Sequence, residues 1–249
     1  MLVTQTLNEP RVRLSRERVL REAVDLADDI GADALTMRRL AEQLGVVPMA
    51  LYKHVANREE LLDGMVDLIV GEIEGELASE QVEPEPPPRP AAATADWQTG
   101  VRRRALAARR TLQRHPWSRR VIEGRTTKTT AVLDYIEQFS SLLLAGGLSP
   151  DLTHHALHAI GGRMWGFTQE LFDESHDAVP APPPDPAMLQ AAAARYPSIV
   201  AVATFRAHDP GSVVGRGCDD NSEFEFALDL WIDGIERLHR RHWSSAPDV

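Results

Sequence analysis

The side chains with the clearest chemical potential lie in the stretch from Thr36 to Val55, which reads TMRRLAEQLGVVPMALYKHV. Its second half combines apolar side chains with hydroxyl, ammonium and imidazole donors, at Pro48, Met49, Ala50, Tyr52, Lys53 and His54. Apolar side chains can contact base edges such as thymine methyl groups, and polar donors can bind backbone phosphates. This mixture on one outward face indicates contact with DNA.

The spacing of the same stretch is that of a helix-turn-helix. Thr36 can cap a first short helix, and Gly45 tolerates the left-handed backbone angles of the turn. Ala41 is small where the two helices would cross. Four apolar residues would hold the pair against a preceding helix: Leu40, Leu44, Leu51 and Val55. Because any two short helices in an α-protein can show this spacing, the composition of the outward face decides the assignment.

The charge of the whole chain opposes DNA binding, but the local charge favours it. The formal net charge is −10, from 27 Lys and Arg against 37 Asp and Glu. Phosphate contacts require positive charge. From residue 36 to residue 58 the only acidic residue is Glu42, against four basic ones: Arg38, Arg39, Lys53 and Arg58. The acidic surplus therefore lies elsewhere.

Patterns that support catalysis are absent from the sequence. It contains no nucleophile elbow, glycine-rich phosphate loop, His-Glu zinc pattern or pair of closely spaced acids in a suitable context. We therefore expect no catalytic residue, no enzyme activity and no cofactor. Two alternatives to a DNA-binding regulator stay open: a small helical ligand-binding enzyme, and a helical adaptor without DNA binding.

Two other clusters have simpler explanations than a binding site. His154 and His158 lie four residues apart with His155 beside them, which is geometry that a metal permits, but no third ligand is evident. We expect no metal site. The densest basic region runs from Arg102 to Lys128 and lacks interleaved aromatic residues. A solvated helix face paired with surrounding acids explains it better than nucleic-acid contact, and an anionic ligand is a third alternative.

Composition bounds the compartment. Cys218 is the single cysteine, which excludes an internal disulfide and is typical of a reducing cytoplasm. No window approaches the ~18 apolar residues of a membrane span, and the N-terminus lacks an apolar signal core. With 43% hydrophobic residues the chain can bury a core, so we expect a folded cytoplasmic protein without a membrane partner.

Helix signals position the candidate DNA-binding face. Residues 1–13 lack periodicity and are expected to form a flexible arm. Ser15 can cap a helix that Gly31 ends, and Asn57 can cap a longer helix after the helix-turn-helix. The first helix carries one apolar face: Val19, Ala23, Leu26, Ala27 and Ile30.

The rest of the chain also has helical periodicity. Five prolines in residues 79–94 predict a loop. Helices are expected at 96–114 and about 128–145, separated by a break at His115-Pro116, and then at 149–172, 188–196 and 222–241. No segment reads as a strand. The sequence therefore predicts an all-α protein, with an N-terminal three-helix helix-turn-helix domain joined to a larger helical domain.

The N-terminal region resembles the tetracycline-repressor (TetR) family of bacterial regulators. The resemblance spans about Leu14 to Ile69 and includes LTMRRLAEQLGVVPMALYKHVANREELLDGMVD. Beyond Asp96 three further segments are similar to the C-terminal domain of that family: His115-Pro116-Trp117, Gly146-Gly147-Leu148-Ser149 and Phe224-Glu225-Phe226. The resemblance implies a DNA-binding domain at 14–60 and an effector-binding and dimerisation domain at 61–249.

Residue by residue, the resemblance implies contacts with double-stranded operator DNA. Thr36 would lie near a phosphate, and Arg38 would reach the edge of the groove. Pro48, Met49 and Ala50 occupy the base-facing positions. Four residues match the phosphate and groove-rim contacts: Tyr52, Lys53, His54 and Arg58. Because Pro48 and Met49 cannot form bidentate hydrogen bonds with bases, apolar contacts and DNA shape would carry more of the specificity.

The resemblance also implies a repressor that a small-molecule effector releases from its operator. The helices at about 149–172 and 222–241 would form a four-helix bundle in a homodimer, although the same faces can pack within one subunit. Apolar and aromatic residues would line the effector site: Trp97, Leu106, Trp117, Phe139, Leu143, Met164, Trp165 and Phe167. Where tetracycline sensors place two histidines on a magnesium chelate, this chain has Glu74 and residues 121–124. This departure argues against a tetracycline ligand.

Overall fold

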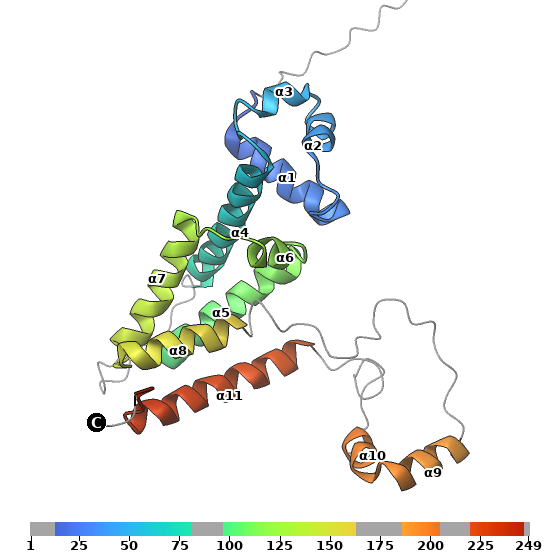
Figure 1. Cartoon of the computed structure of the whole chain (residues 1–249), viewed down its shortest axis with the longest axis vertical. Helices are drawn as coiled ribbons and strands as arrows, with labels where there is room; N and C mark the ends of the chain where they lie inside the picture. The colour runs from blue at the N-terminus through green and yellow to red at the C-terminus, as the bar shows by residue number, and fades with distance from the viewer. Residues whose placement is uncertain (1–12, 81–96, 163–185, 205–219, 247–249) are drawn as a thin grey trace, which may run out of the picture. The chain divides into compact units, whose positions relative to one another are not determined.

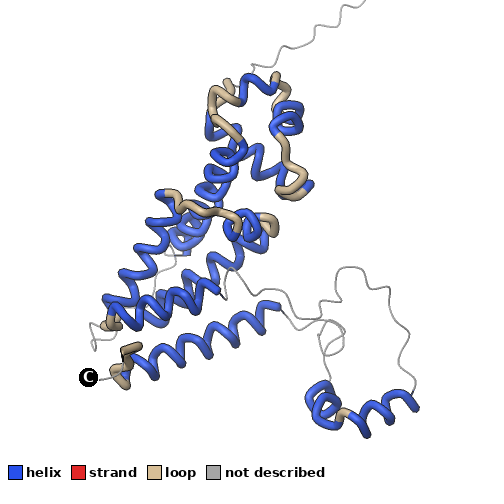
Figure 2. The backbone as a smooth tube through the Cα atoms, viewed as in Figure 1, coloured by secondary structure: helices blue, strands red, loops and turns tan. Residues whose placement is uncertain are grey.

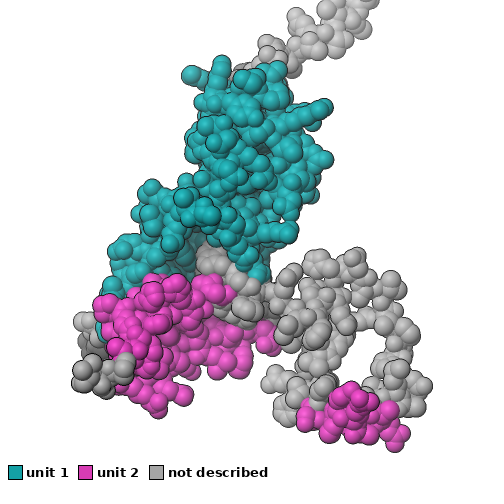
Figure 3. Space-filling view, viewed as in Figure 1, with its two compact units in different colours: residues 1–148 teal, residues 149–249 magenta. Residues whose placement is uncertain are grey.

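The computed structural model describes residues 13–80, 97–162, 186–204 and 220–246. Every regular element in these ranges is an α-helix, as Figure 2 shows. The predicted all-α fold is therefore confirmed. The chain divides into two compact units, residues 1–148 and 149–249 (Figure 3).

Three helices form one end of the first unit (Figure 1): α1 (Arg16–Ile30), α2 (Met37–Gln43) and α3 (Pro48–Leu51). The predicted caps are present, because the Ser15 side chain accepts a hydrogen bond from the backbone N–H of Arg18 and Thr36 Oγ1 accepts one from Arg39. Each satisfies a donor that the first helical turn leaves unpaired. The first helix ends at Gly31 with φ 78°, a backbone angle that favours glycine.

A continuous apolar core joins these three helices to the fourth. On α1 the buried face runs from Val19 to Ala27, so Ile30, which we expected on that face, is exposed instead. On α2, Ala41, expected at the crossing of the two helices, and Leu40, expected as an apolar anchor, are both fully buried. Leu44 is half-buried and packs against the same core.

Helix α4 (Arg58–Glu80) begins in this core and runs on into the other half of the unit (Figure 1). Asn57 Oδ1 accepts from the backbone N–H of Glu60, and the Glu60 carboxylate accepts from that of Ala56, a reciprocal arrangement close to the predicted capping box. The helix includes Ser79 and Glu80, which were expected to be the first two residues of the proline-rich loop. The remainder of that loop, like the arm at residues 1–12, lies outside the described residues.

Three more helices pack around α4: α5 (Trp97–Arg114), α6 (Ser118–Glu123) and α7 (Thr130–Ala145). The first and last match the predicted helices. The sequence did not predict α6. This helix has only six residues, and Trp117, which precedes it at the N-cap position, forms no side-chain cap.

The second unit contains α8 (Pro150–Gly161), α9 (Pro186–Arg195), α10 (Pro197–Thr204) and α11 (Asp220–Arg240). Ser149 caps α8 through a hydrogen bond from Leu152, as predicted. Buried residues of α8 and α11 pack together: Leu152, Ala156, Ile160, Phe224, Leu228, Ile232 and Ile235. The expected continuation of α8 to residue 172 lies outside the described residues, and α10 was not predicted.

Candidate nucleic-acid interface

The turn between α2 and α3 presents α3 to solvent. Gly45 has φ 65°, and Val46 N–H donates to Ala41 O at 2.9 Å, which closes the turn. Pro48 occupies the first turn of α3, where its missing N–H leaves no bond unmade. The two helices therefore have the predicted helix-turn-helix connection.

In α3 and the residues that follow it, two apolar side chains are buried and most of the others are exposed. Leu51 and Val55 are fully buried, whereas 71% of Met49 and 45% of Tyr52 remain exposed. Pro48 and Lys53 are also exposed, and Ala50 and His54 are half-buried. All six residues expected to face DNA therefore have solvent-accessible surface. The buried side chains of Leu51 and Val55 hold this segment against the core.

The residues expected around the edge of this face have local protein partners. Arg38 is exposed and its Nε lies 2.9 Å from Glu42 Oε1; the hydrogen bond and charge of Glu42 raise the pKa of Arg38. Arg58 Nη2 donates to the backbone oxygen of Ala32 at 3.1 Å. Arg58 thus ties the start of α4 to the segment between α1 and α2, a structural contact that the sequence did not indicate.

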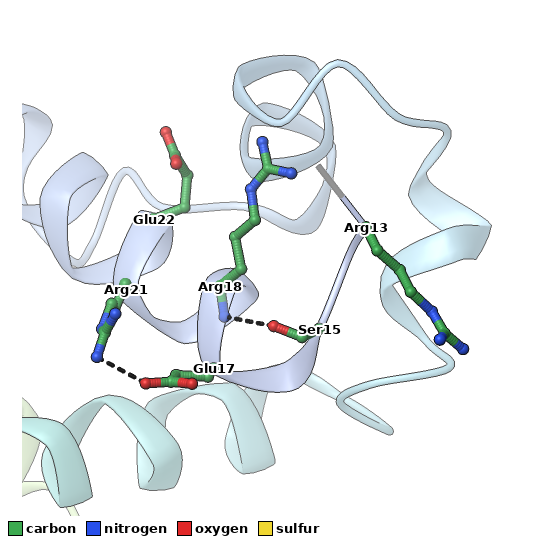
Figure 4. A pocket seen from close by; sticks show the side chains of 6 residues that line it. All are labelled: Arg13, Ser15, Glu17, Arg18, Arg21 and Glu22. Carbon is green, nitrogen blue, oxygen red and sulfur yellow. Dashed lines mark hydrogen bonds and ion pairs between the residues drawn. The ribbon is translucent and has the colours of Figure 1, made fainter. Parts of the chain in front are cut away.

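A shallow open pocket of about 380 Å³ lies at the start of α1 (Figure 4). Six residues line it: Arg13, Ser15, Glu17, Arg18, Arg21 and Glu22. Its charges are mixed, because Glu17 forms an ion pair with Arg21 at 2.6 Å, and Ser15 is already occupied as the helix cap. The pocket therefore resembles a solvated helix start more than a binding site for one ligand.

The basic stretch after residue 102 pairs with acids, as predicted. Arg104 lies 2.7 Å from Glu74, and Arg110 lies 2.9 Å from Glu76. Burial raises the pKa of Glu76, but hydrogen bonds from Arg114 and Arg110 outweigh it, so the net pKa is lowered. These ion pairs join α5 to the C-terminal part of α4.

One polar cluster lies inside the helices that surround α4. The Arg104 side chain, 15% exposed, bonds Glu74 of α4 and Gln138 of α7, and its guanidinium lies 5.8 Å from the centre of the Tyr135 ring. Burial raises the pKa of Tyr135. Glu74 is thus held in an ion pair.

The residues expected to line an effector site divide into three groups. Trp97 of α5 and Phe139 and Leu143 of α7 are buried, and Leu106 of α5 is half-buried. Trp117 belongs instead to the apolar core of the DNA-binding helices, and its Nε1 donates to Asp28 at 2.6 Å. Met164, Trp165 and Phe167 lie outside the described residues.

The histidines of α8 are exposed, and their rings contact one another edge to face. The ring centres of His154 and His158 are 4.6 Å apart, and those of His155 and Trp243 are 5.3 Å apart. Within the described residues, no group of three His, Cys, Asp or Glu side chains could hold a metal ion. No helix in the same ranges is both long and apolar enough to cross a bilayer.

Comparison with known proteins agrees with this architecture. The family described as "Bacterial regulatory proteins, tetR family" matches residues 19–65, and "Tetracyclin repressor-like, C-terminal domain" matches residues 89–239. The HTH-type transcriptional repressor DrrR1 of Streptomyces coeruleorubidus is 29% identical over 244 residues, covering 96% of this chain and 83% of that protein. Tetracycline repressor protein class G of Vibrio anguillarum is 27% identical over 226 residues, covering 91% and 95%.

A solved structure shows the same fold. The crystal structure of a possible TetR family transcriptional regulator from Streptomyces coelicolor A3(2) is 26% identical, and the similarity covers 90% of this chain and 100% of that one with a TM-score of 0.64. The fold and the exposed face of α3 define a helix-turn-helix DNA-binding transcriptional regulator. The chain belongs to the TetR family of bacterial regulators, as its sequence predicted.

Proposed function

We propose that the protein is a homodimeric cytoplasmic repressor that binds a two-fold operator and leaves it when a small molecule binds its C-terminal helices. Residues 14–60 form the DNA-binding domain in this proposal, and residues 61–249 form the effector-binding and dimerisation domain. The relative DrrR1 carries the name of a transcriptional repressor, which supports the direction of regulation.

The exposed face of α3 carries the DNA-binding proposal. Met49 and Tyr52 are large, exposed side chains, and the buried residues Leu51 and Val55 beside them in the sequence anchor this segment. An exposed apolar and aromatic face on a helix that is otherwise well anchored is suited to the major groove. The proposed DNA contacts are Thr36, Arg38, Pro48, Met49, Ala50, Tyr52, Lys53, His54 and Arg58.

Dimerisation through α8 and α11 is supported by a second exposed apolar face. Phe224, Leu228, Ile232 and Ile235 are the buried face of α11, yet Phe226 and Leu230 remain 61% and 58% exposed. These two residues lie four apart on one side of the helix, where a second copy can cover them. A two-fold operator requires two recognition helices, so the dimer completes the DNA-binding unit.

The effector would bind among the helices that surround α4. The expected lining residues Trp97, Leu106, Phe139 and Leu143 come from α5 and α7, and Arg104, Glu74 and Gln138 supply polar groups beside them. The ion pair of Glu74 argues for an effector other than a tetracycline–magnesium chelate. Binding of the effector would move α4. The two recognition helices of the dimer would then no longer be about 34–36 Å apart, the length of one turn of DNA.

Selection of genomic DNA fragments by the purified full chain tests this function. The expected result is enrichment of fragments that share a two-fold sequence, with binding that weakens as salt rises. A protein that enriches no fragment at low ionic strength would contradict the proposal. Compounds connected with the genes beside the selected fragments can then be tested for release of the protein from that DNA.

A further inference from the structure

His115 lies between the DNA-binding helices and α4. It directly follows α5, and its ring is almost completely buried. Nδ1 lies 2.9 and 3.0 Å from the two carboxylate oxygens of Asp28 on α1. Nε2 lies 3.0 Å from Oε2 of Glu72 on α4. One imidazole therefore bridges the carboxylates of Asp28 and Glu72, which belong to two helices and are 44 residues apart along the chain.

The donors and acceptors of this bridge define its protonation. Ionised carboxylates only accept hydrogen bonds, and a neutral imidazole has one N–H to donate. Both contacts can be hydrogen bonds only when both ring nitrogens carry a proton. An imidazolium at His115 would make both contacts hydrogen bonds at the same time.

The charged groups around the ring are mostly negative. Asp25 and Asp28 face the ring from α1, Glu72 faces it from α4, and Arg114 of α5 lies 3.3 Å from the Glu72 oxygen that the ring contacts. Three carboxylates against one guanidinium leave a net negative environment. The Trp117 Nε1 bond fixes the Asp28 carboxylate in its place.

We propose that His115, as an imidazolium, is a positioning residue for DNA binding, because it clamps α1 to α4 across the boundary between the DNA-binding helices and the rest of the chain. Loss of one ring proton leaves a bare nitrogen facing a carboxylate, and that contact is lost. The helix-turn-helix is then held less firmly to α4, so operator affinity falls as the pH rises. This inference rests on the proposed DNA-binding function.

The state of the ring can be measured directly. ¹⁵N NMR of the His115 ring, in the full-length protein without DNA, distinguishes an imidazolium from either neutral tautomer. We expect both ring nitrogens to be protonated under the conditions where the selected DNA fragment binds with full affinity. As pH is raised, the change in the ring signals should coincide with a fall of about tenfold in affinity. A neutral ring at full affinity would overturn the proposal.

Two variants separate positioning from simple loss of structure. The amide of His115→Gln carries both of its donors on one nitrogen, so it cannot span the two carboxylates as the two ring nitrogens do. The DNA affinity of this variant should therefore be about tenfold weaker at low pH and should lack the fall at higher pH that His115 causes. Glu72→Gln should remove the pH effect while retaining affinity, because its amide can accept from a ring N–H or donate to a bare ring nitrogen. His242→Gln, at an exposed position beyond α11, is the matched control, and its DNA affinity should depend on pH as that of the parent does.

The results distinguish this inference from the proposed function. If the parent protein binds no DNA fragment at any pH, the proposed function fails and the role in DNA binding fails with it, while the ring signals still report the imidazolium bridge. If DNA binds but His115→Gln keeps the full pH effect of the parent, only the inference about His115 is wrong. Circular dichroism of each variant confirms that its helices are intact.

Discussion

Leu51, the last residue of α3, and Tyr52, which directly follows it, differ in burial: Leu51 is fully buried in the core of the DNA-binding helices, whereas 45% of Tyr52 is exposed. A single helical step thus separates a residue that holds the helix from one that can contact DNA. Substitutions at the two positions should affect different properties of the protein.

Tyr52→Ala and Lys53→Ala should weaken operator binding without unfolding the protein, because both side chains are exposed. Lys53→Ala should also reduce the slope of log affinity against log salt by about one, the effect of losing one phosphate contact. Fluorescence anisotropy with the selected DNA fragment, measured at several salt concentrations, gives both quantities. Mutants that bind as tightly as the parent would contradict the assignment of this face to the groove.

Leu51→Ala should instead destabilise the fold by roughly 2–5 kcal/mol, the usual cost of removing a large buried side chain. The neighbouring Met49→Ala is the matched control, since Met49 is 71% exposed and its loss should change stability by no more than about 0.5 kcal/mol. Urea unfolding followed by circular dichroism measures both. Similar losses for the two variants would show that α3 is not anchored through Leu51.

Local signals in the sequence were sufficient for the DNA-binding helices. Ser15 and Thr36 form the caps that their side chains predicted, and the glycines Gly31 and Gly45 adopt positive φ where each helix ends or turns. These effects operate over three or four residues, so one short segment contains the information. The family resemblance of the same segment is confirmed by the comparisons.

Contacts between distant segments were beyond such signals. The basic stretch was expected to pair with acids, but the sequence could not name Glu76 as the partner of Arg114, because 38 residues separate them. The bridge from Asp28 to His115 spans 87 residues. Nothing local marks Trp117 as part of the DNA-binding core rather than an effector site. The assignments of individual DNA and effector contacts remain predictions for the experiments proposed above.

The acid stability of the helices around α4 should depend on Glu76. Its pKa is lowered by hydrogen bonds from Arg114 and Arg110, which outweigh the opposing effect of burial. A carboxyl with a lower pKa in the folded state contributes stability above its unfolded value, about 4.3, and loses it as pH falls through the folded value. Glu76→Gln should therefore be less stable than the parent at neutral pH, and the difference should shrink in acid. Urea unfolding at a series of pH values measures it; a difference that stays constant would exclude this ionisation as the cause.

The exposed pair Phe226 and Leu230 should hold the dimer together. Both side chains are large and exposed within one subunit, so replacing them with Glu should leave the helices of that subunit intact while placing charges in the proposed interface. Sedimentation velocity should show a monomer for the double variant and a dimer for the parent. Operator affinity should fall sharply in the monomer, because it engages only one of the two half-sites with a single recognition helix. Leu133→Glu is the matched control, since Leu133 is an exposed leucine on α7 and its substitution should leave the dimer unchanged. A double variant that stays dimeric would show that the two copies associate through another surface.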